Sequence, residues 1–445
     1  MKVYFVLFFI WCAFQSDLLS QVENPIDNLF YVDTTNSKLF TGPYSWQYEN
    51  GQIGEKTNYL NGKANGEYFL YNEDGTLNYK ANYSKGELQG ESTWYYENGA
   101  IHFKSNYLNG VLEGESIYYD LTGKLELKEN YKENLLEGIS IGYYPEGQIR
   151  EKKNYIGGSQ EGESISYYKN GQINTQIHYK NNNPNGEYIS YFENGKIKNK
   201  TNYVDDNIHG EMIWYHENGQ IANRTNFKNG KAQGEFIAYH HTGKIECKGN
   251  QSNGLMIGIW TYYDSLGKLA SKKNFTNGMQ DGDDYTYFPN GKIKEYKNYL
   301  NGEVKGESYK NYSNGKIYEK CNYVDNLKQD TLYRFYKNGK ISYKENYNLG
   351  IKKGKATWYH KNGNPFFTME YEKNLRNGAF TAMYKNGVTL ATGRFYNDEI
   401  KGQYTTYHKN GKISYTCVFK NALATEEKFY DMNGQQHIEK DTKCK

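Results

Sequence analysis

Glycine recurs in this chain at a fixed interval of 24 residues. Sixteen glycines follow one another at this spacing, and we call them the turn glycines. They are Gly51, Gly75, Gly99, Gly123, Gly147, Gly171, Gly195, Gly219, Gly243, Gly267, Gly291, Gly315, Gly339, Gly363, Gly387 and Gly411. A fixed period of this length is the signature of a repeat architecture, in which each repeat is one supersecondary unit that packs on its neighbours.

Other positions keep the same period. The residue eight places after the turn glycine is aromatic, as in Tyr59 and Tyr83, except at Gln251. The residue two places after it is Ile or Leu in fourteen of sixteen repeats, Pro365 and Thr389 being the exceptions. Because these positions and the apolar ones four and six places before the glycine are evenly spaced, we expect them to share one face of an extended strand.

Two turns divide each repeat. Asn-Gly precedes the second half-strand in eleven repeats, and we expect both turn residues to take φ > 0, as in a two-residue hairpin turn. Eleven residues after the turn glycine comes Gly, Asn or Asp in fifteen successive repeats, from Gly62 to Asp398, which indicates a second left-handed position. Two turns and two strands leave no room for a helix. The sequence therefore predicts an all-β fold, an elongated single-sheet array of about sixteen 24-residue β-hairpin repeats with a capping unit at each end.

The ends of the chain depart from the period. Lys2 precedes an apolar run over residues 3–14, so we expect residues 1–20 to be a signal peptide. The alternative, a membrane anchor, needs about 20 apolar residues. We expect an N-terminal cap over 21–41, the repeat array over 42–423, and a degenerate C-terminal cap and tail over 424–445. Export would place the protein in the periplasm, on the outer-membrane surface or outside the cell.

Charge and cysteines limit the possible functions. The net charge is +3 over 445 residues, which is too balanced to indicate nucleic acid binding. Cys247, Cys321 and Cys417 lie in different repeats. Neighbouring repeats would be about 9.6 Å apart, two strand spacings, whereas a disulfide needs Cα atoms within about 7 Å. We therefore expect no structural disulfide among these three.

The repeat unit resembles a known family. Residues 90–99, GESTWYYENG, followed by NYLNG at 106–110, resemble the MORN-repeat variant found in many bacterial proteins. The resemblance implies glycine-rich hairpins that build an elongated, twisted antiparallel sheet. It also implies scaffolding, attachment to membrane surfaces or partner binding, and some bacterial variants carry an antitoxin label. It implies no set of catalytic residues.

No residue pattern points to catalysis. His216, His240, His360 and His408 all lie three places before a turn glycine, where Tyr stands in other repeats, so they occupy an ordinary repeat position. The chain has no phosphate-binding loop, HExxH motif or CxxC pair. We therefore expect no catalytic residues, no cofactor-binding residues and no metal site, and we expect the chain not to be an enzyme.

Aromatic residues are the remaining candidates for function. The chain holds 48 tyrosines, and five tryptophans stand near the tyrosine positions of the array. We expect a partly exposed binding surface at Trp46, Trp94, Trp214, Trp260 and Trp358. The alternative is that these rings only pack on glycines of the neighbouring strand.

This pattern favours a non-enzymatic exported scaffold that presents a Tyr-rich surface to an unidentified protein partner at the cell envelope, without a small-molecule cofactor. Two other functions stay open. One is a peripheral binder of membrane lipid or glycan, and the other is an antitoxin or immunity partner.

Overall fold

The structure is a computed structural model that describes residues 22–24, 29–31 and 38–437. The predicted signal peptide at 1–20, the end of the predicted C-terminal tail, Cys12 and Cys444 lie outside these residues, as does much of the predicted N-terminal cap.

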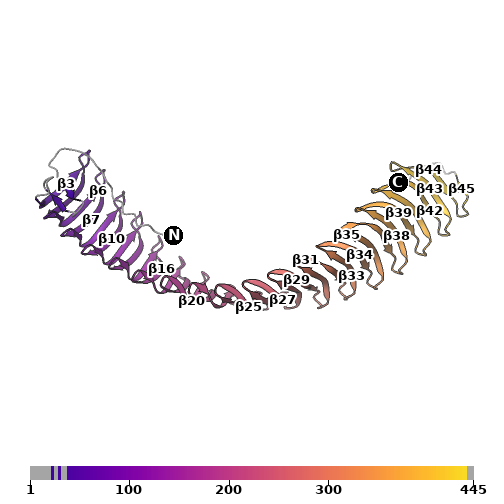
Figure 1. The fold of residues 1–445 in the computed structure, drawn as a ribbon, viewed down its shortest axis with the longest axis horizontal. Helices are drawn as coiled ribbons and strands as arrows, with labels where there is room; N and C mark the ends of the chain where they lie inside the picture. The colour runs from indigo at the N-terminus through magenta and orange to yellow at the C-terminus, as the bar shows by residue number, and fades with distance from the viewer. Residues whose placement is uncertain (1–21, 25–28, 32–37, 438–445) are drawn as a thin grey trace. The chain divides into compact units, whose positions relative to one another are not determined.

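The chain divides into two compact units, residues 1–207 and 208–445. From residue 42 on, the strands of each unit form an open antiparallel sheet in which successive hairpins lie side by side (Figure 1). Residues 22–24 and 29–31 form a separate antiparallel pair. No helix occurs in the described residues. The all-β hairpin-repeat fold predicted from the sequence is therefore confirmed.

Most repeats hold an eight-residue strand after the turn glycine and a second strand that is often interrupted at one residue. In the first unit the strands are β1 (Val22–Asn24), β2 (Leu29–Tyr31), β3 (Gly42–Gln47), β4 (Ile53–Leu60), β5 (Lys63–Ala64), β6 (Gly66–Tyr71), β7 (Leu77–Ser84), β8 (Glu87–Leu88), β9 (Gly90–Tyr95), β10 (Ile101–Leu108), β11 (Val111–Leu112), β12 (Gly114–Tyr119), β13 (Leu125–Lys132), β14 (Leu135–Leu136), β15 (Gly138–Tyr143), β16 (Ile149–Ile156), β17 (Ser159–Gln160), β18 (Gly162–Tyr167), β19 (Ile173–Lys180), β20 (Asn183–Tyr191) and β21 (Ile197–Val204). The unit boundary falls within β22 (Asn207–Ile208).

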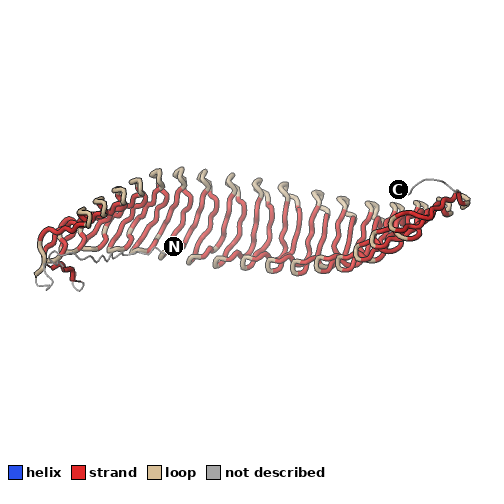
Figure 2. Tube along the Cα trace, turned by 90° about the horizontal axis from the view of Figure 1, so that it is seen from above, coloured by secondary structure: helices blue, strands red, loops and turns tan. Residues whose placement is uncertain are grey.

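The second unit continues the pattern. Its strands are β23 (Gly210–Tyr215), β24 (Ile221–Lys228), β25 (Lys231–Tyr239), β26 (Ile245–Ser252), β27 (Leu255–Tyr263), β28 (Leu269–Thr276), β29 (Met279–Tyr287), β30 (Ile293–Leu300), β31 (Glu303–Val304), β32 (Gly306–Asn311), β33 (Ile317–Val324), β34 (Leu327–Phe335), β35 (Ile341–Asn348), β36 (Ile351–Lys352), β37 (Gly354–Tyr359), β38 (Pro365–Glu372), β39 (Leu375–Met383), β40 (Thr389–Tyr396), β41 (Glu399–Ile400), β42 (Gly402–Tyr407), β43 (Ile413–Lys420), β44 (Leu423–Tyr430) and β45 (Gln436–His437). Within each unit the turns run along the two edges of the sheet, with the strands between them (Figure 2).

The turn at the turn glycine differs from the predicted type. Between β9 and β10, Gly99 has φ 80°, whereas Asn98 is not among the residues with positive φ. The Gly99 N–H donates to the Tyr96 carbonyl at 2.8 Å, and the Tyr96 N–H donates to the Ala100 carbonyl at 2.8 Å. This is a three-residue loop in which one left-handed glycine follows a turn with negative φ. The prediction that both turn residues take φ > 0 is wrong here.

The second turn has the geometry predicted for the first. Asn109 and Gly110 have φ of 52° and 77°, and they join the paired residues Leu108 and Val111. A two-residue loop with both φ positive matches the right-handed twist of the flanking strands. The restriction of this position to Gly, Asn and Asp therefore has the predicted cause.

A bulge beside the first turn changes which residues share a face. Trp94 pairs with Phe103, but Tyr95 pairs with Ile101, so the strand β10 carries an extra residue there. Thr93, six places before the turn glycine, consequently pairs with Lys104. The prediction that this position lies on the same face as the aromatic residues after the turn is wrong, because it assumed a turn without a bulge.

Hydrogen bonds connect successive repeats along both rows of turns. At the first turn, Asn98 Nδ2 donates to the Leu121 carbonyl at 3.0 Å. At the second turn, the Asn109 N–H donates to Gln89 Oε1 at 3.0 Å, and the Gly110 N–H donates to the Leu88 carbonyl at 2.8 Å. Equivalent bonds recur along both units, so each repeat is held to its neighbours by turns as well as by strand pairing.

The exceptions to the repeat sequence keep the repeat geometry. Asp330 replaces a glycine and has φ 63°, and Ala422 replaces another and also has φ 63°. Pro365 begins β38 and pairs with Tyr359. Within the described residues, Cys247, Cys321 and Cys417 are free thiols, and none of the three is bonded to another.

Candidate interaction surface

The two faces of each hairpin differ in chemistry. In β9 and β10, Ser92 and Trp94 pair with Ser105 and Phe103 on one face, which we call the aromatic face. Thr93 and Lys104 lie on the opposite face, which we call the charged face. The centre of the aromatic face is tightly packed: Ser92 is 1% exposed, and Ser105 is 3% exposed. Because serine side chains are small, neighbouring aromatic rings on the same face can extend over this centre.

Trp94 lies within a row of rings on the aromatic face of the first unit. Its ring centroid is 4.3 Å from that of Tyr79 and 6.0 Å from that of Phe103, and Phe103 is in turn 5.5 Å from Tyr118. Trp94 is 36% exposed, so it keeps a solvent-facing area although it packs against the rings of Tyr79 and Phe103. Among the five tryptophans it fits the predicted exposed anchor best.

Trp46, Trp214 and Trp358 are half-buried at the same repeat position as Trp94, five places before the turn glycine. Trp46 donates from Nε1 to Glu55 Oε2 at 3.1 Å. Its ring also covers Gly54, where an added Cβ would lie 2.2 Å from the ring. Trp358 lies between rings on both sides, with centroids 4.8 Å from Tyr343 and 5.2 Å from Phe367.

Trp260 is different, because it stands seven places before its turn glycine and is only 4% exposed. Its ring covers Gly249, where an added Cβ would lie 2.3 Å from the indole. Its Nε1 donates to the Asn250 carbonyl at 3.2 Å. The prediction that Trp260 is partly exposed is therefore wrong, because a glycine on the paired strand makes room for the whole ring.

Charged residues replace the row of rings in part of the second unit. Glu295, Lys310, Glu319 and Arg334 occupy the positions that Tyr79, Trp94, Phe103 and Tyr118 hold in the first unit. Lys310 lies 3.9 Å from Glu295 and 4.0 Å from Glu319, and Glu319 is 2.7 Å from Arg334. These residues, with Lys297 3.2 Å from Glu295, form an ionic row across neighbouring hairpins.

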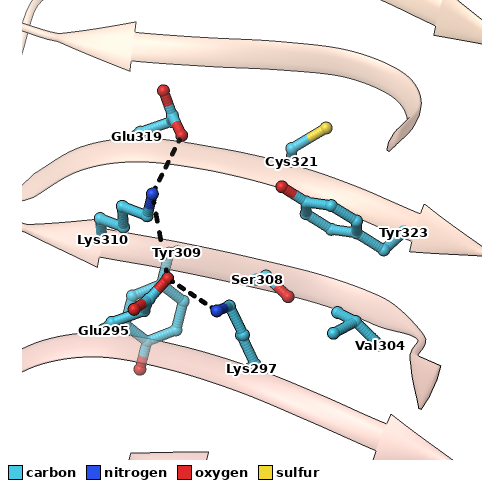
Figure 3. A pocket seen from close by; sticks show the side chains of 9 residues that line it. All are labelled: Glu295, Lys297, Val304, Ser308, Tyr309, Lys310, Glu319, Cys321 and Tyr323. Carbon is cyan, nitrogen blue, oxygen red and sulfur yellow. Dashed lines mark ion pairs between the residues drawn. The ribbon is translucent and has the colours of Figure 1, made fainter. Parts of the chain in front are cut away.

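A cavity of about 210 Å³ lies beside this ionic row, with Cys321 and Tyr323 at its far side (Figure 3). Burial raises the pKa of the Cys321 thiol, which keeps it protonated and a weak nucleophile. The carboxylates of Glu295 and Glu319 both pair with cations. These ion pairs across neighbouring hairpins fit a structural role for the ionic row.

Three of the four histidines, His216, His240 and His408, make the same contact as the tyrosines that they replace, whereas His360 Nε2 is buried without a hydrogen-bond partner among the described residues. Tyr96 donates from its hydroxyl to the carbonyl of Tyr119 in the next repeat at 2.9 Å. His216 Nε2 makes the equivalent bond to the Tyr239 carbonyl at 2.9 Å, and its ring lies 3.9 Å from that of His241. Within the described ranges there is no group of three or more His, Cys, Asp or Glu side chains that could hold a metal ion.

Sequence analysis missed the ionic row and the packing of Trp260. The signal for the row was present, since acid and base alternate at positions where rings stand elsewhere. Trp260 could have been separated from the other four by its different distance from the turn glycine.

The family assignment follows from this geometry and from comparison with known proteins. The model of the MORN repeat variant matches thirteen segments: residues 64–85, 88–109, 112–133, 136–156, 160–181, 184–205, 208–229, 256–277, 280–301, 305–325, 331–349, 352–373 and 401–421. These cover more than half of the chain, and the chain belongs to the MORN-repeat variant family. No curated protein matches it.

Solved structures with some likeness come from large toxin complexes. A crystal structure of TcdB2-TccC3-Cdc42 matches at 12% identity, with 87% of this chain and 25% of that chain covered and a TM-score of 0.13. The pore structure of the Photorhabdus luminescens Tc holotoxin matches at 11% identity, with coverages of 90% and 27% and a TM-score of 0.14. This chain thus spans about a quarter of the length of those chains. At such TM-scores the likeness carries no argument about function.

No helix in the described part of the chain is long and apolar enough to cross a membrane.

Proposed function

We propose that this chain is a non-enzymatic exported scaffold that presents its aromatic face to a protein partner at the cell envelope. The observation that carries the proposal is the row through Trp94, where an indole that packs against two neighbouring rings keeps 36% of its surface exposed. A rigidly held aromatic ring loses little conformational freedom on binding, and such rings are common anchors of protein interfaces. The apolar run at residues 3–14 supports export.

Replacing Trp94 by Ala tests this proposal. Residues 21–445 would carry an affinity tag and capture partners from the envelope fraction of the source organism. We expect one protein at near-stoichiometric yield, and we expect Trp94→Ala to weaken its binding by about 2 kcal/mol, roughly 30-fold, as for an interface anchor.

Leu121→Ala is the matched control, because Leu121 is 62% exposed in a turn of the same unit and lies outside the strands that carry the row of rings. Its partner affinity should stay at the wild-type value, and both variants should keep the wild-type β circular dichroism. Equal affinity of the Trp94 variant and wild type would contradict the proposal. Capture of lipid or glycan without protein would favour a peripheral binder instead.

A further inference from the structure

Most acidic side chains of the charged face pair with a cation of the same hairpin. The acid stands eight places before the turn glycine, and the cation stands five places after it. Six repeats form this pair at up to 3.9 Å, namely Glu67–Lys80, Glu91–Lys104, Glu115–Lys128, Glu187–Lys200, Glu211–Arg224 and Glu307–Lys320. Six of the sixteen repeats thus carry this ion pair, which recurs in both units but is not present in every repeat.

Two adjacent repeats of the second unit break this pairing in opposite ways. In the first, Ile259 replaces the acid, and no acidic side chain pairs with Lys272 within the described residues. In the next, Tyr296 replaces the cation, and Asp283 has no ion pair among the described residues. One repeat thus keeps only its cation, and its neighbour keeps only its anion.

The two unpaired charges line one surface cavity. The cavity measures about 340 Å³, and Ile259, Lys272, Asp283 and Tyr285 help to line it. Lys272 is directly opposite Tyr285 across the neighbouring strands, and Asp283 lies two residues along the same strand as Tyr285. Ile259 is 64% exposed and adds an apolar wall.

Hydrogen bonds orient the Asp283 carboxylate but do not use all of its acceptor capacity. Its Oδ1 accepts the Tyr296 hydroxyl at 2.8 Å and Asn298 Nδ2 at 3.2 Å, and its Oδ2 accepts the Tyr285 hydroxyl at 3.2 Å. A carboxylate accepts about four hydrogen bonds, so Oδ2 has room for one more donor. The donors already present are all neutral, which leaves the negative charge for a ligand.

We propose that this cavity binds a zwitterion of the amino-acid or dipeptide class. The carboxylate of the ligand pairs with Lys272, and its ammonium group donates to Asp283 Oδ2 beside the ring of Tyr285. The apolar part of the ligand packs against Tyr285 and Ile259. A cation and an anion that both neighbour one aromatic residue match such a ligand in charge, whereas a ligand with a single charge would match only one half of the site.

Binding of alanyl-alanine to residues 21–445, measured by calorimetry, tests this proposal. Because the site is exposed to solvent, we expect a dissociation constant on the order of 1 mM. The N-acetylated and the C-amidated dipeptides each lack one charge and should bind at least about tenfold more weakly. Tyr296→Lys gives Asp283 a cationic partner, and Ile259→Glu gives Lys272 an acidic partner. Each variant should weaken dipeptide binding to a similar degree.

Glu307→Gln is the matched control, because it removes the Glu307–Lys320 ion pair of the next repeat and should leave the affinity for alanyl-alanine unchanged. Circular dichroism checks that each variant is folded, and the nearly isosteric Asp283→Asn replaces Tyr296→Lys if that variant does not fold. The proposal is overturned if no saturable binding of alanyl-alanine occurs, if the capped dipeptides bind as well as the free one, or if the variants at Asp283 and Tyr296 bind with wild-type affinity.

Discussion

Tyrosine has two separate roles in this chain, which depend on its place in the repeat. Three places before the turn glycine, Tyr96 reaches across to a carbonyl of the next repeat, and His216 can replace such a tyrosine because an imidazole nitrogen makes the same contact. Eight places after the turn glycine, Tyr83 packs its ring against Tyr68 at 5.5 Å. The first role needs a polar atom at the end of the side chain, whereas the second needs apolar area.

Because of the packed tyrosines, the free energy of unfolding should decrease at alkaline pH. Burial raises the pKa of Tyr83 and of Tyr107, and burial together with the hydrogen bond to Asp283 raises the pKa of Tyr296 to about 12. A pKa that is higher in the folded state gives stability that is fully present below the unfolded value of about 10. That stability is lost as the pH rises from about 10 through the folded pKa.

We therefore expect the free energy of unfolding to fall above pH 10, measured by urea denaturation at a series of pH values. Tyr83→Phe removes one of the hydroxyls and should make the fall less steep. A free energy that stays constant through this range would show that these phenols are not buried in the folded protein.

At the scale of the hairpin, the left-handed turn positions are the most constrained part of the element. Ala422 holds φ 63° at a second turn, at the repeat position where glycine, asparagine or aspartate stands in the fifteen preceding repeats. A side chain with a Cβ at positive φ costs about 1–2 kcal/mol per residue. Glycine relieves this strain but loses more backbone entropy on folding, by about 0.4–1 kcal/mol.

Ala422→Gly should therefore stabilise the hairpin of β43 and β44 by about 0.5–1 kcal/mol. The protection of the β43 and β44 amides against hydrogen exchange measures this change locally. Ala424→Gly is the matched control within β44, where φ is not positive, and it should reduce protection instead. If both variants reduced protection equally, Ala422 would not be strained.

The hairpins could be predicted from the sequence because their turns depend on single residues. The left-handed glycines and the Gly, Asn or Asp position are local requirements of the backbone, and they are visible in a single repeat. The bulge beside Trp94 was not predictable in this way, since it depends on whether Gly99 alone or both turn residues adopt positive φ. That one-residue difference decides which side chains share a face.

The candidate surface was only partly predictable for a related reason. The position of Trp94 in its row is a property of paired strands, and the burial of Trp260 depends on Gly249 in the strand that pairs with it. The ionic row from Glu295 to Arg334 likewise arises between hairpins. Sequence periods identify equivalent positions, but they do not show which of these positions meet across neighbouring strands.

At the scale of the whole molecule, the central claim is that stability and structure are built from 24-residue hairpins that interact with their neighbours. In such an array stability is approximately a sum of repeat and interface contributions. Removal of residues 66–89 takes out 24 residues and brings equivalent positions of the flanking repeats together, so the turn bonds and strand pairs can form again. Removal of residues 66–77 takes out half of that length and places turn positions opposite strand positions.

Circular dichroism and urea denaturation of these two deletion variants, compared with wild type, test the claim most directly. We expect the 24-residue deletion to keep the wild-type β signal per residue and a cooperative unfolding transition. The 12-residue deletion should lose β signal although it removes less of the chain. An equal loss of β signal in both variants would contradict the hairpin-array account.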